Sequence, residues 1–541
     1  MLLPQNRVGG EFMFIFLSFA IFLVAVFAIA WYKAKGTDNT ETATGYFLAG
    51  RGLSGPVIAA TMILTNLSTE QIIGLNGQSY ATNMGPMAWE VTSCVALITL
   101  ALIFLPRYLK GGITTIPDYL EERFDSTTKR IVSILFLVSY VVTYIPTVLY
   151  SGGLVLNQIF GISDLLGIST FQAVALTGFL LGVVGAIYTV LGGMKLAAFS
   201  DTVNGLGLLI GGLLVPILGI LLLGNGDFVG GFEIIIATPE KLNAINPANA
   251  QSPLIPWPVL FTGLLFNNLF YWCTNQSIVQ KALGASSLKE AQKGAILAGL
   301  IKVLTPAILV FPGIIAFAKY GDALPNADMA YPTLLLDVLP KPLLGIFAAI
   351  LFGAAMSSLN GAMNSSSTLF TLDLYKPIIN PEASDKQLVK VGQKFIIVVS
   401  VISVIVAPFI LYAPSGLYNF LQECNGYFNV PILACVIVGF FTKRVPSLAA
   451  KVVFVVHIVL YTLSKFFLSD IHFLYVLGVL LPIGVIVMLI IGKIKPRETD
   501  FVQADKALID MTPWKYAKPA SLAVVLVMAF IYLLFSPIGL A

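Results

Sequence analysis

The sequence predicts an all-α protein that crosses a membrane many times, and three observations lead to this fold class. Apolar residues make up 57% of the 541 residues, and charged residues make up only 11%. The apolar residues gather in about fourteen long segments, most of which reach the twenty or so residues needed to cross a bilayer. The basic residues gather in alternate loops between those segments. A soluble globular domain shows none of these features.

The expected spans follow one another closely. They cover residues 12–31, 57–77, 83–106, 131–158, 171–191, 198–223, 257–280, 292–318, 342–372, 392–412, 416–440, 446–467, 471–492 and 518–537. The first span is expected to stay as an anchor and not to be cleaved as a signal peptide, because Lys33 and Lys35 follow it. The connections 224–256 and 319–341 are long enough for short surface helices, and 493–517 is expected to be a solvated loop.

The distribution of the basic residues predicts how the chain sits in a cell membrane. The odd-numbered loops and their flanks hold 25 of the 31 Lys and Arg residues, whereas the even-numbered loops and the tails hold five. Because basic loops stay in the cytoplasm, both termini are expected on the outer side. The net charge of +4 lies in short loops beside apolar spans, so the lipid bilayer, and not nucleic acid, is the expected partner.

The one basic residue that belongs to neither group of loops is Lys302, which lies well inside an apolar span. A charge at that depth is costly and marks a functional position by default.

The sequence shows no pattern of residues that is typical of an enzyme's catalytic or metal site. His457 and His472 are too few and too widely separated for a zinc site or a catalytic triad. The cysteines fall in or beside apolar segments and are interpreted as small buried hydrophobic residues: Cys94, Cys273, Cys424 and Cys435. We therefore expect neither an enzyme nor a metal-cysteine centre.

Two of the expected spans are interrupted by polar residues. Residues 64–71 include six polar residues among eight, and residues 267–276 hold a second polar run. Backbone can leave the helical geometry at membrane depth only where protein or a water-filled cavity satisfies its polar groups. The two spans lie five apart, so the second is inverted relative to the first. Paired broken helices in inverted repeats favour a secondary transporter, although polar seams also hold ordinary helix bundles together.

The span at 342–372 holds a third polar centre. Ser357 and Ser358 lie in its middle among small residues that allow close helix approach. A serine pair facing the carbonyls of a broken helix would form a cation site of five oxygens with no carboxylate. Such a site suits a releasable Na⁺ ion.

These segments resemble one protein family closely. Residues 45–51 (GYFLAGR), 66–74 (NLSTEQIIG), 271–280 (YWCTNQSIVQ) and 368–375 (TLFTLDLY) are similar to segments of the sodium:solute symporters, in particular the bacterial and animal sodium/sugar cotransporters. The resemblance runs from about residue 45 to 440 and implies a five-plus-five inverted-repeat core. An extra helix at 12–31 would precede a core at 57–440, and peripheral helices at 446–537 would follow, all within one transporter domain.

The resemblance also implies which residues would form the binding sites. Carbonyls and hydroxyls would hold Na⁺: Leu64, Leu67, Ala354, Ser357 and Ser358. Polar side chains would hold a sugar, whose hydroxyls both donate and accept: Gln71, Glu90, Ser93, Asn268, Lys302 and Gln422. Four residues would form gates: Leu75, Trp89, Tyr271 and Tyr418. Asp201 would support sodium coupling, unless it serves as a helix cap.

Structural roles remain open for several of these side chains. Glu90 and Lys302 would also be explained by an ion pair between helices, although a buried pair is weak evidence for stability. Gln422 would also be explained by a hydrogen bond between helices, and Tyr271 by aromatic packing.

The function expected is Na⁺-coupled symport of a neutral monosaccharide of the galactose or glucose type into the cell by alternating access. A channel would present a continuous polar stripe, and a nutrient sensor would add a soluble domain. Within the symporters, the alternative substrates are sialic acid, an amino acid such as proline, or another carboxylate. No Arg lies within a span, which disfavours an anion held by a bidentate guanidinium, although helix N-termini also bind carboxylates.

Overall fold

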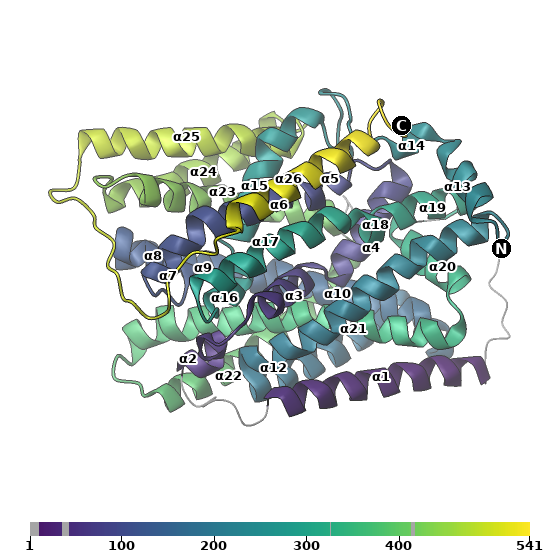
Figure 1. Ribbon diagram of the computed structural model, residues 1–541. Coiled ribbons are helices and arrows are strands. Elements are labelled where there is room, and N and C mark those ends of the chain that lie inside the picture. Colours follow the sequence, from purple (N-terminus) through teal and green to yellow (C-terminus); the bar gives the residue numbers. More distant parts are fainter. Residues whose placement is uncertain (1–9, 35–42, 325, 413–416) are drawn as a thin grey trace.

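The computed structural model describes residues 10–34, 43–324, 326–412 and 417–541. Helices make up nearly all of this part, and within it no strand forms beyond three isolated bridges. The long helices run along one common direction (Figure 1). Ten helical stretches of the described residues are long and apolar enough to cross a membrane, and a pair of helices bent by 44° would make an eleventh. The predicted all-α membrane fold is confirmed, while the count of fourteen crossings stays a prediction.

The first half of the chain provides the extra helix and the first broken helix. Its helices are α1 (Gly10–Ala34), α2 (Ala43–Leu48), α3 (Gly55–Asn66), α4 (Thr69–Ala81), α5 (Met87–Val91), α6 (Ser93–Thr99), α7 (Leu105–Lys110), α8 (Ile116–Arg123), α9 (Ser126–Val138), α10 (Ile145–Phe160), α11 (Ile162–Leu166) and α12 (Thr170–Leu223). The backbone of α12 is helical throughout, and this helix contains the apolar stretches Thr170–Val190 and Val203–Leu223.

The second half repeats the pattern with another broken helix. Its helices are α13 (Phe228–Ile236), α14 (Pro239–Leu242), α15 (Gly263–Cys273), α16 (Gln276–Leu283), α17 (Leu288–Leu304), α18 (Pro306–Leu309), α19 (Phe311–Tyr320), α20 (Ala330–Val338), α21 (Lys341–Thr368), α22 (Asp385–Val406) and α23 (Leu417–Phe441). The helices α24 (Ser447–Phe467), α25 (Phe473–Ile494) and α26 (Ala517–Leu534) follow. As predicted, the connections 224–256 and 319–341 carry short helices: α13, α14 and α20.

Short 3₁₀ and π segments connect or extend these helices. They are η1 (Ala49–Arg51), η2 (Leu100–Phe104), η3 (Ser139–Tyr144), η4 (Trp257–Phe261), η5 (Ala327–Met329), η6 (Leu369–Ile379) and η7 (Ala407–Tyr412). The π-helical η6 continues α21 to the end of the bundle where the basic loops lie.

The loops predicted to share one side of the membrane contact one another. Arg51 Nη2 donates to the carbonyls of Gly112 and Ile113, at 3.3 and 3.1 Å. Its Nη1 donates to the carbonyl of Leu283, at 3.3 Å. At the other end of the bundle, Lys241 Nζ donates to the carbonyl of Tyr80, at 3.0 Å. The alternation of basic loops therefore predicts which loops gather at each end.

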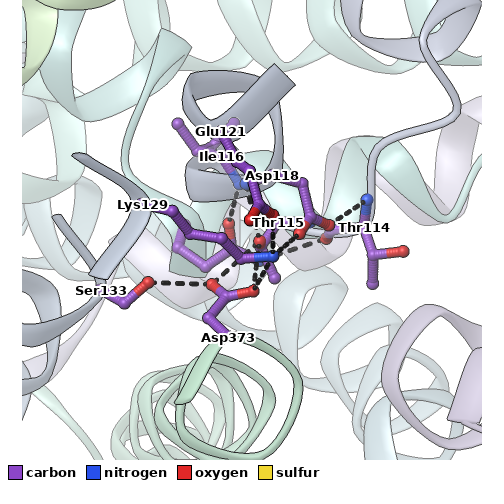
Figure 2. A network of polar contacts seen from close by, with 9 residues as sticks. Thr114, Thr115, Ile116, Asp118, Glu121, Lys129, Ser133 and Asp373 are labelled. Atoms are coloured by element: carbon purple, nitrogen blue, oxygen red, sulfur yellow. Dashed lines mark hydrogen bonds and ion pairs between the residues drawn. The ribbon is translucent and has the colours of Figure 1, made fainter. Parts of the chain in front are cut away.

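A partly buried polar network joins the elements at the basic end (Figure 2). Lys129 Nζ, on α9, lies 2.7 Å from Asp118 Oδ1, 2.7 Å from Glu121 Oε2 and 3.4 Å from Asp373 Oδ1. Asp373 is fully buried in η6 and also accepts hydrogen bonds from the hydroxyls of Thr115 and Ser133. The network therefore fixes α8 against α9 and against the end of the long α21–η6 helix.

The same end is tied to the second broken helix. Gln276 Oε1, at the start of α16, accepts a hydrogen bond from the backbone N–H of Ile116, at 2.8 Å. Gln276 Nε2 donates to Gln280 Oε1 at 3.0 Å, and Gln280 Nε2 donates to the carbonyl of Phe47 at 2.8 Å. One half of a broken helix is therefore packed into the basic end of the bundle.

Candidate ion and solute site

The first broken helix stops where the sequence turns polar. α3 ends at Asn66 and α4 begins at Thr69, so Leu67 and Ser68 leave the helix, with ψ of 68° and 173°. The N–H of Ser68 donates to the carbonyl of Asn66, at 2.8 Å, and not to that of Leu64 four residues back. The Leu64 carbonyl thereby loses its helical donor. A break of this kind supplies backbone oxygens at a buried position.

The serine pair of α21 faces this break. Ser358 Oγ donates to the carbonyl of Thr65, at 2.9 Å, and the hydroxyl of Tyr144 donates to the same carbonyl, at 3.1 Å. Ser357 Oγ is buried and has no hydrogen-bond partner. Ala354 is buried one turn before the pair on the same helix. The structure therefore brings α21 and the break together, as the sequence predicts, with Thr65 as the contact that the sequence reasoning missed.

A glycine allows the two helices to approach so closely. A Cβ added at Gly361 would lie 2.8 Å from Cγ2 of Thr65, which is closer than real Cβ atoms come. The neighbouring Asn360 side chain points to another helix, where Oδ1 accepts a hydrogen bond from the hydroxyl of Thr189, at 2.7 Å. The small residues around Ser357 and Ser358 thus have a packing role beside the candidate cation site.

The second broken helix lies between α15 and α16. The backbone leaves the helix at Thr274 and Asn275, and Asn275 then caps α16 by accepting from the N–H of Ser277. The interruption predicted for residues 267–276 is therefore confirmed only at the last residues of that run, Thr274 and Asn275. Residues 267–273 remain helical.

A buried ion pair lies beside the first break. Lys302, on α17, donates to Glu90 Oε2 on α5, and also to Asn66 Oδ1 at the end of α3, at 2.5 Å. Glu90 Oε2 accepts a further hydrogen bond from the hydroxyl of Thr305, at 2.9 Å. The side chains of Glu90 and Lys302 are each 1% exposed. Glu90 and Lys302 therefore neutralise each other inside the bundle, in contact with the broken helix.

Three of the other predicted solute residues, Ser93, Asn268 and Gln422, each make a hydrogen bond of their own. Asn268 Nδ2 donates to the hydroxyl of Thr92 at 2.8 Å, and the hydroxyl of Ser93 donates to the carbonyl of Glu90. Gln422 Oε1 accepts from Asn267 Nδ2, at 3.1 Å. The hydrogen bond between Gln422 and Asn267 matches the alternative role for Gln422, because it joins α23 to α15.

Four of the remaining predicted residues have described side chains: Gln71, Leu75, Trp89 and Tyr271. Gln71 is buried near the start of α4, and its Oε1 has no partner. Leu75 and Trp89 are buried, and Tyr271 is half-buried with its ring at 5.3 Å, edge-on, from that of Trp272. The Tyr271 hydroxyl lies beside Asn66 and Tyr144. The side chains of Asp201 and Tyr418 lie outside the described residues.

Sequence reasoning missed several polar contacts that complete the cluster. Thr65, Asn66 and Asn267 lie in the two polar runs, but the sequence does not show which distant residues they contact. The missed contacts are Thr65, Asn66, Thr92, Thr305, Asn267 and Asn429, the last of which donates to Asn267 Oδ1 at 2.5 Å.

Comparisons with known proteins show which family the chain belongs to. The sequence model described as "Sodium:solute symporter family" matches residues 46–451. The chain is 51% identical over 520 residues to the uncharacterised symporter YidK of Escherichia coli strain K12, covering 95% of this chain and 90% of that protein. It is 33% identical to the sodium/glucose cotransporter of Vibrio parahaemolyticus, covering 80% of this chain and 81% of that protein. It is 31% identical to human sodium/myo-inositol cotransporter 2, covering 82% of this chain and 67% of that protein.

A solved structure shares the fold. A Na⁺-coupled sialic acid symporter in its substrate-bound outward-open state superposes with a TM-score of 0.75 and 23% sequence identity, over 89% of this chain and 96% of that one. At this identity the likeness shows the fold alone. The family match, by contrast, spans most of the chain, and the relatives match it over most of their own length. The chain therefore belongs to the sodium:solute symporter family, whose members are multi-pass membrane transporters and not enzymes.

Proposed function

We propose that this protein couples the entry of Na⁺ to the uptake of a neutral monosaccharide by alternating access. The observation that carries the proposal is the buried Glu90–Lys302 pair in contact with Asn66 at the first break. A polyhydroxylated solute needs donors and acceptors at one place, and the cluster offers a carboxylate, an ammonium and side-chain amides there. Gln71, Ser93, Asn268 and Gln422 are proposed as further contacts, and Leu75, Trp89, Tyr271 and Tyr418 as gates.

The charge balance of the cluster favours a neutral solute over a carboxylate. Lys302 is the basic residue of the cluster, and Glu90 already neutralises it. A carboxylate solute would have to displace Glu90 or leave two anions beside one cation, and a buried uncompensated charge is costly. The relatives named as sodium/glucose and sodium/myo-inositol cotransporters support the same choice, because both named solutes are neutral polyols.

The sodium ion is proposed to bind between the first break and α21. Its ligands would be the carbonyls of Leu64, Leu67 and Ala354 and the hydroxyls of Ser357 and Ser358. Ser357 Oγ lacks a partner, and Ser358 Oγ would turn from the Thr65 carbonyl to the ion. An oxygen-only set fits the preference of a hard cation. Asp201 is proposed to support the coupling.

We also propose the placement of this machinery in the cell. The basic loops would face the cytoplasm, with both termini outside a cell membrane. The helix at 12–31 and the helices at 446–537 would flank the inverted-repeat core at 57–440 within a single domain. The end of the bundle with few basic residues would then receive the solute from outside.

A panel of labelled solutes tests the substrate class. Purified protein in proteoliposomes with an inward Na⁺ gradient is offered galactose, glucose, myo-inositol, sialic acid and proline. We expect one or more of the neutral polyols to accumulate above its outside concentration. Accumulation of sialic acid or proline, with no neutral polyol taken up, would contradict the proposed substrate class.

Replacing Ser358 by alanine should weaken sodium dependence more than solute recognition. Loss of one ligand from a buried site costs about 1–3 kcal/mol, so the Na⁺ concentration for half-maximal uptake should rise by about tenfold. The measurement is initial uptake against Na⁺ concentration. Ser366→Ala is the matched control, because Ser366 Oγ is also buried and without a partner on the same helix. An unchanged Na⁺ dependence in Ser358→Ala would remove Ser358 from the cation site.

A further inference from the structure

An open basic hollow on the surface, called the basic cavity below, lies away from the candidate transport site, where the last turns of α23 and α25 meet the loop that follows α25. Its volume is about 510 Å³. Its lining residues are Phe441, Thr442, Lys443, Arg444, Val445, Leu489, Gly492, Lys493 and Asp500. The cavity lies at the same end of the bundle as the polar network of Figure 2, because Arg123 of α8 contacts its wall.

The charged groups of the cavity are mostly positive. Arg444 Nε donates to Asp500 Oδ1, at 2.6 Å, and the guanidinium holds the pKa of Asp500 below its usual range. Lys443 and Lys493 have no ion-pair partner among the described residues. One carboxylate therefore faces three cations, and an anionic ligand would find two ammonium groups and the free edge of a guanidinium.

The loop that carries Lys443 and Arg444 is held in place by buried contacts. The Arg123 side chain is fully buried and donates to the carbonyls of Gly439, Thr442 and Val445, at 3.1, 3.1 and 3.0 Å. On the other side, the carbonyls of Lys443 and Arg444 accept from the backbone N–H groups of Phe501 and Arg497, at 3.1 and 2.8 Å. The backbone that carries Lys443 and Arg444 is thus held in a fixed position.

The cavity continues into an apolar surface on the spanning helices. Phe441 at the end of α23 is 63% exposed, and Leu489 and Ile490 near the end of α25 are 44% and 51% exposed. Both helices are long and apolar enough to cross the membrane. A ligand that fills the cavity would therefore meet cations at one end and lipid-facing apolar side chains at the other. This combination fits an amphipathic anion better than a free one.

We propose that the basic cavity binds the phosphate headgroup of an anionic phospholipid of the cytoplasmic leaflet, with the acyl chains lying along Phe441 and Leu489. Basic pockets between helices on the cytoplasmic side are suited to such headgroups. The inference rests on the membrane orientation given under the proposed function. It does not depend on which solute is transported.

Lipid retention by the purified, delipidated protein tests the proposal. Palmitoyl-oleoyl phosphatidylglycerol or the zwitterionic phosphatidylcholine is added, and bound lipid is counted by native mass spectrometry. The variant Lys443→Gln/Arg444→Gln/Lys493→Gln should bind phosphatidylglycerol on the order of 100-fold more weakly, because each charge near the surface contributes about fivefold. Lys386→Gln/Lys390→Gln/Lys394→Gln removes the same charge from α22 and should bind normally.

Three outcomes would contradict the proposed lipid site. Equal retention of the two lipids, or unchanged phosphatidylglycerol binding by the cavity variant, overturns it. Complete displacement of phosphatidylglycerol by inorganic phosphate alone would assign the cavity to a free anion. The single variants Lys443→Gln and Lys493→Gln replace the triple variant if that variant does not fold. The assay contains neither Na⁺ nor solute, so a failure here leaves the proposed transport intact, and a failure of transport leaves lipid retention measurable.

Discussion

Replacing Lys302 by alanine is expected to abolish Na⁺-driven solute uptake. Lys302 contacts both the Glu90 carboxylate and the Asn66 side chain at the first break. Hydrogen bonds to charged groups contribute about 1.5–3 kcal/mol each, so the loss of both should lower initial uptake by at least about 100-fold. Uptake into proteoliposomes, normalised to the amount of folded protein, measures the effect.

The single variant also leaves Glu90 buried without its partner, which costs about 3–5 kcal/mol in stability. The double variant Glu90→Gln/Lys302→Met removes both charges and should fold with near-normal stability. If Glu90 and Lys302 bind solute, the double variant folds and does not transport. A folded double variant with normal uptake would show that Glu90 and Lys302 stabilise the helix packing and do not bind solute. Lys293→Met on the same helix, whose pair with Glu290 is partly exposed, should transport normally.

Replacing Lys129 by methionine is expected to destabilise the protein strongly. Asp373 has a fully buried side chain, and Lys129 is its cationic neighbour at 3.4 Å as well as the partner of Asp118 and Glu121 (Figure 2). Removing the cation leaves a buried carboxylate without compensation, at about 3–5 kcal/mol. The measurement is the loss of monodisperse protein on heating in detergent.

The matched control for this variant is Lys110→Met. Lys110 lies 4.0 Å from Asp505 at the same end of the bundle, but both side chains are about half exposed. An exposed pair contributes about 0–1 kcal/mol, so this variant should be nearly as stable as the parent. Adding Asp373→Asn to Lys129→Met should restore part of the lost stability. Equal stability of Lys129→Met and Lys110→Met would show that the network does not hold the bundle end together.

The fold could be predicted largely because local composition carries the signal. Long apolar stretches predict the helices, and the six polar residues among positions 64–71 mark the first break, which occurs at Leu67 and Ser68. The second break lies later than the centre of its polar run. Asn267 and Asn268 stay within α15, where they hydrogen-bond to Gln422 and Thr92. Polar character in a span therefore predicts buried hydrogen bonds between helices more surely than it predicts a broken backbone.

Features that depend on distant partners could not be predicted. Lys129 and Asp373 look like ordinary loop charges in the sequence, and only the packing of α9 against η6 joins them. Thr65 likewise gives no sign that its carbonyl faces Ser358. The bend of 44° between α17 and α19 did carry a local signal, because Pro306 interrupts the helix there. The sequence thus indicates the polar centres, while their pairings follow from the tertiary structure.

Ion replacement tests the central claim most directly. Proteoliposomes containing the purified protein are given the labelled neutral sugar that accumulates best, under an inward gradient of Na⁺, K⁺, choline or protons at equal ionic strength. With Na⁺ we expect the sugar to accumulate above its equilibrium level. With K⁺ or choline at constant pH we expect no accumulation above that level. Equal concentrative uptake under a proton gradient without Na⁺ would contradict the account.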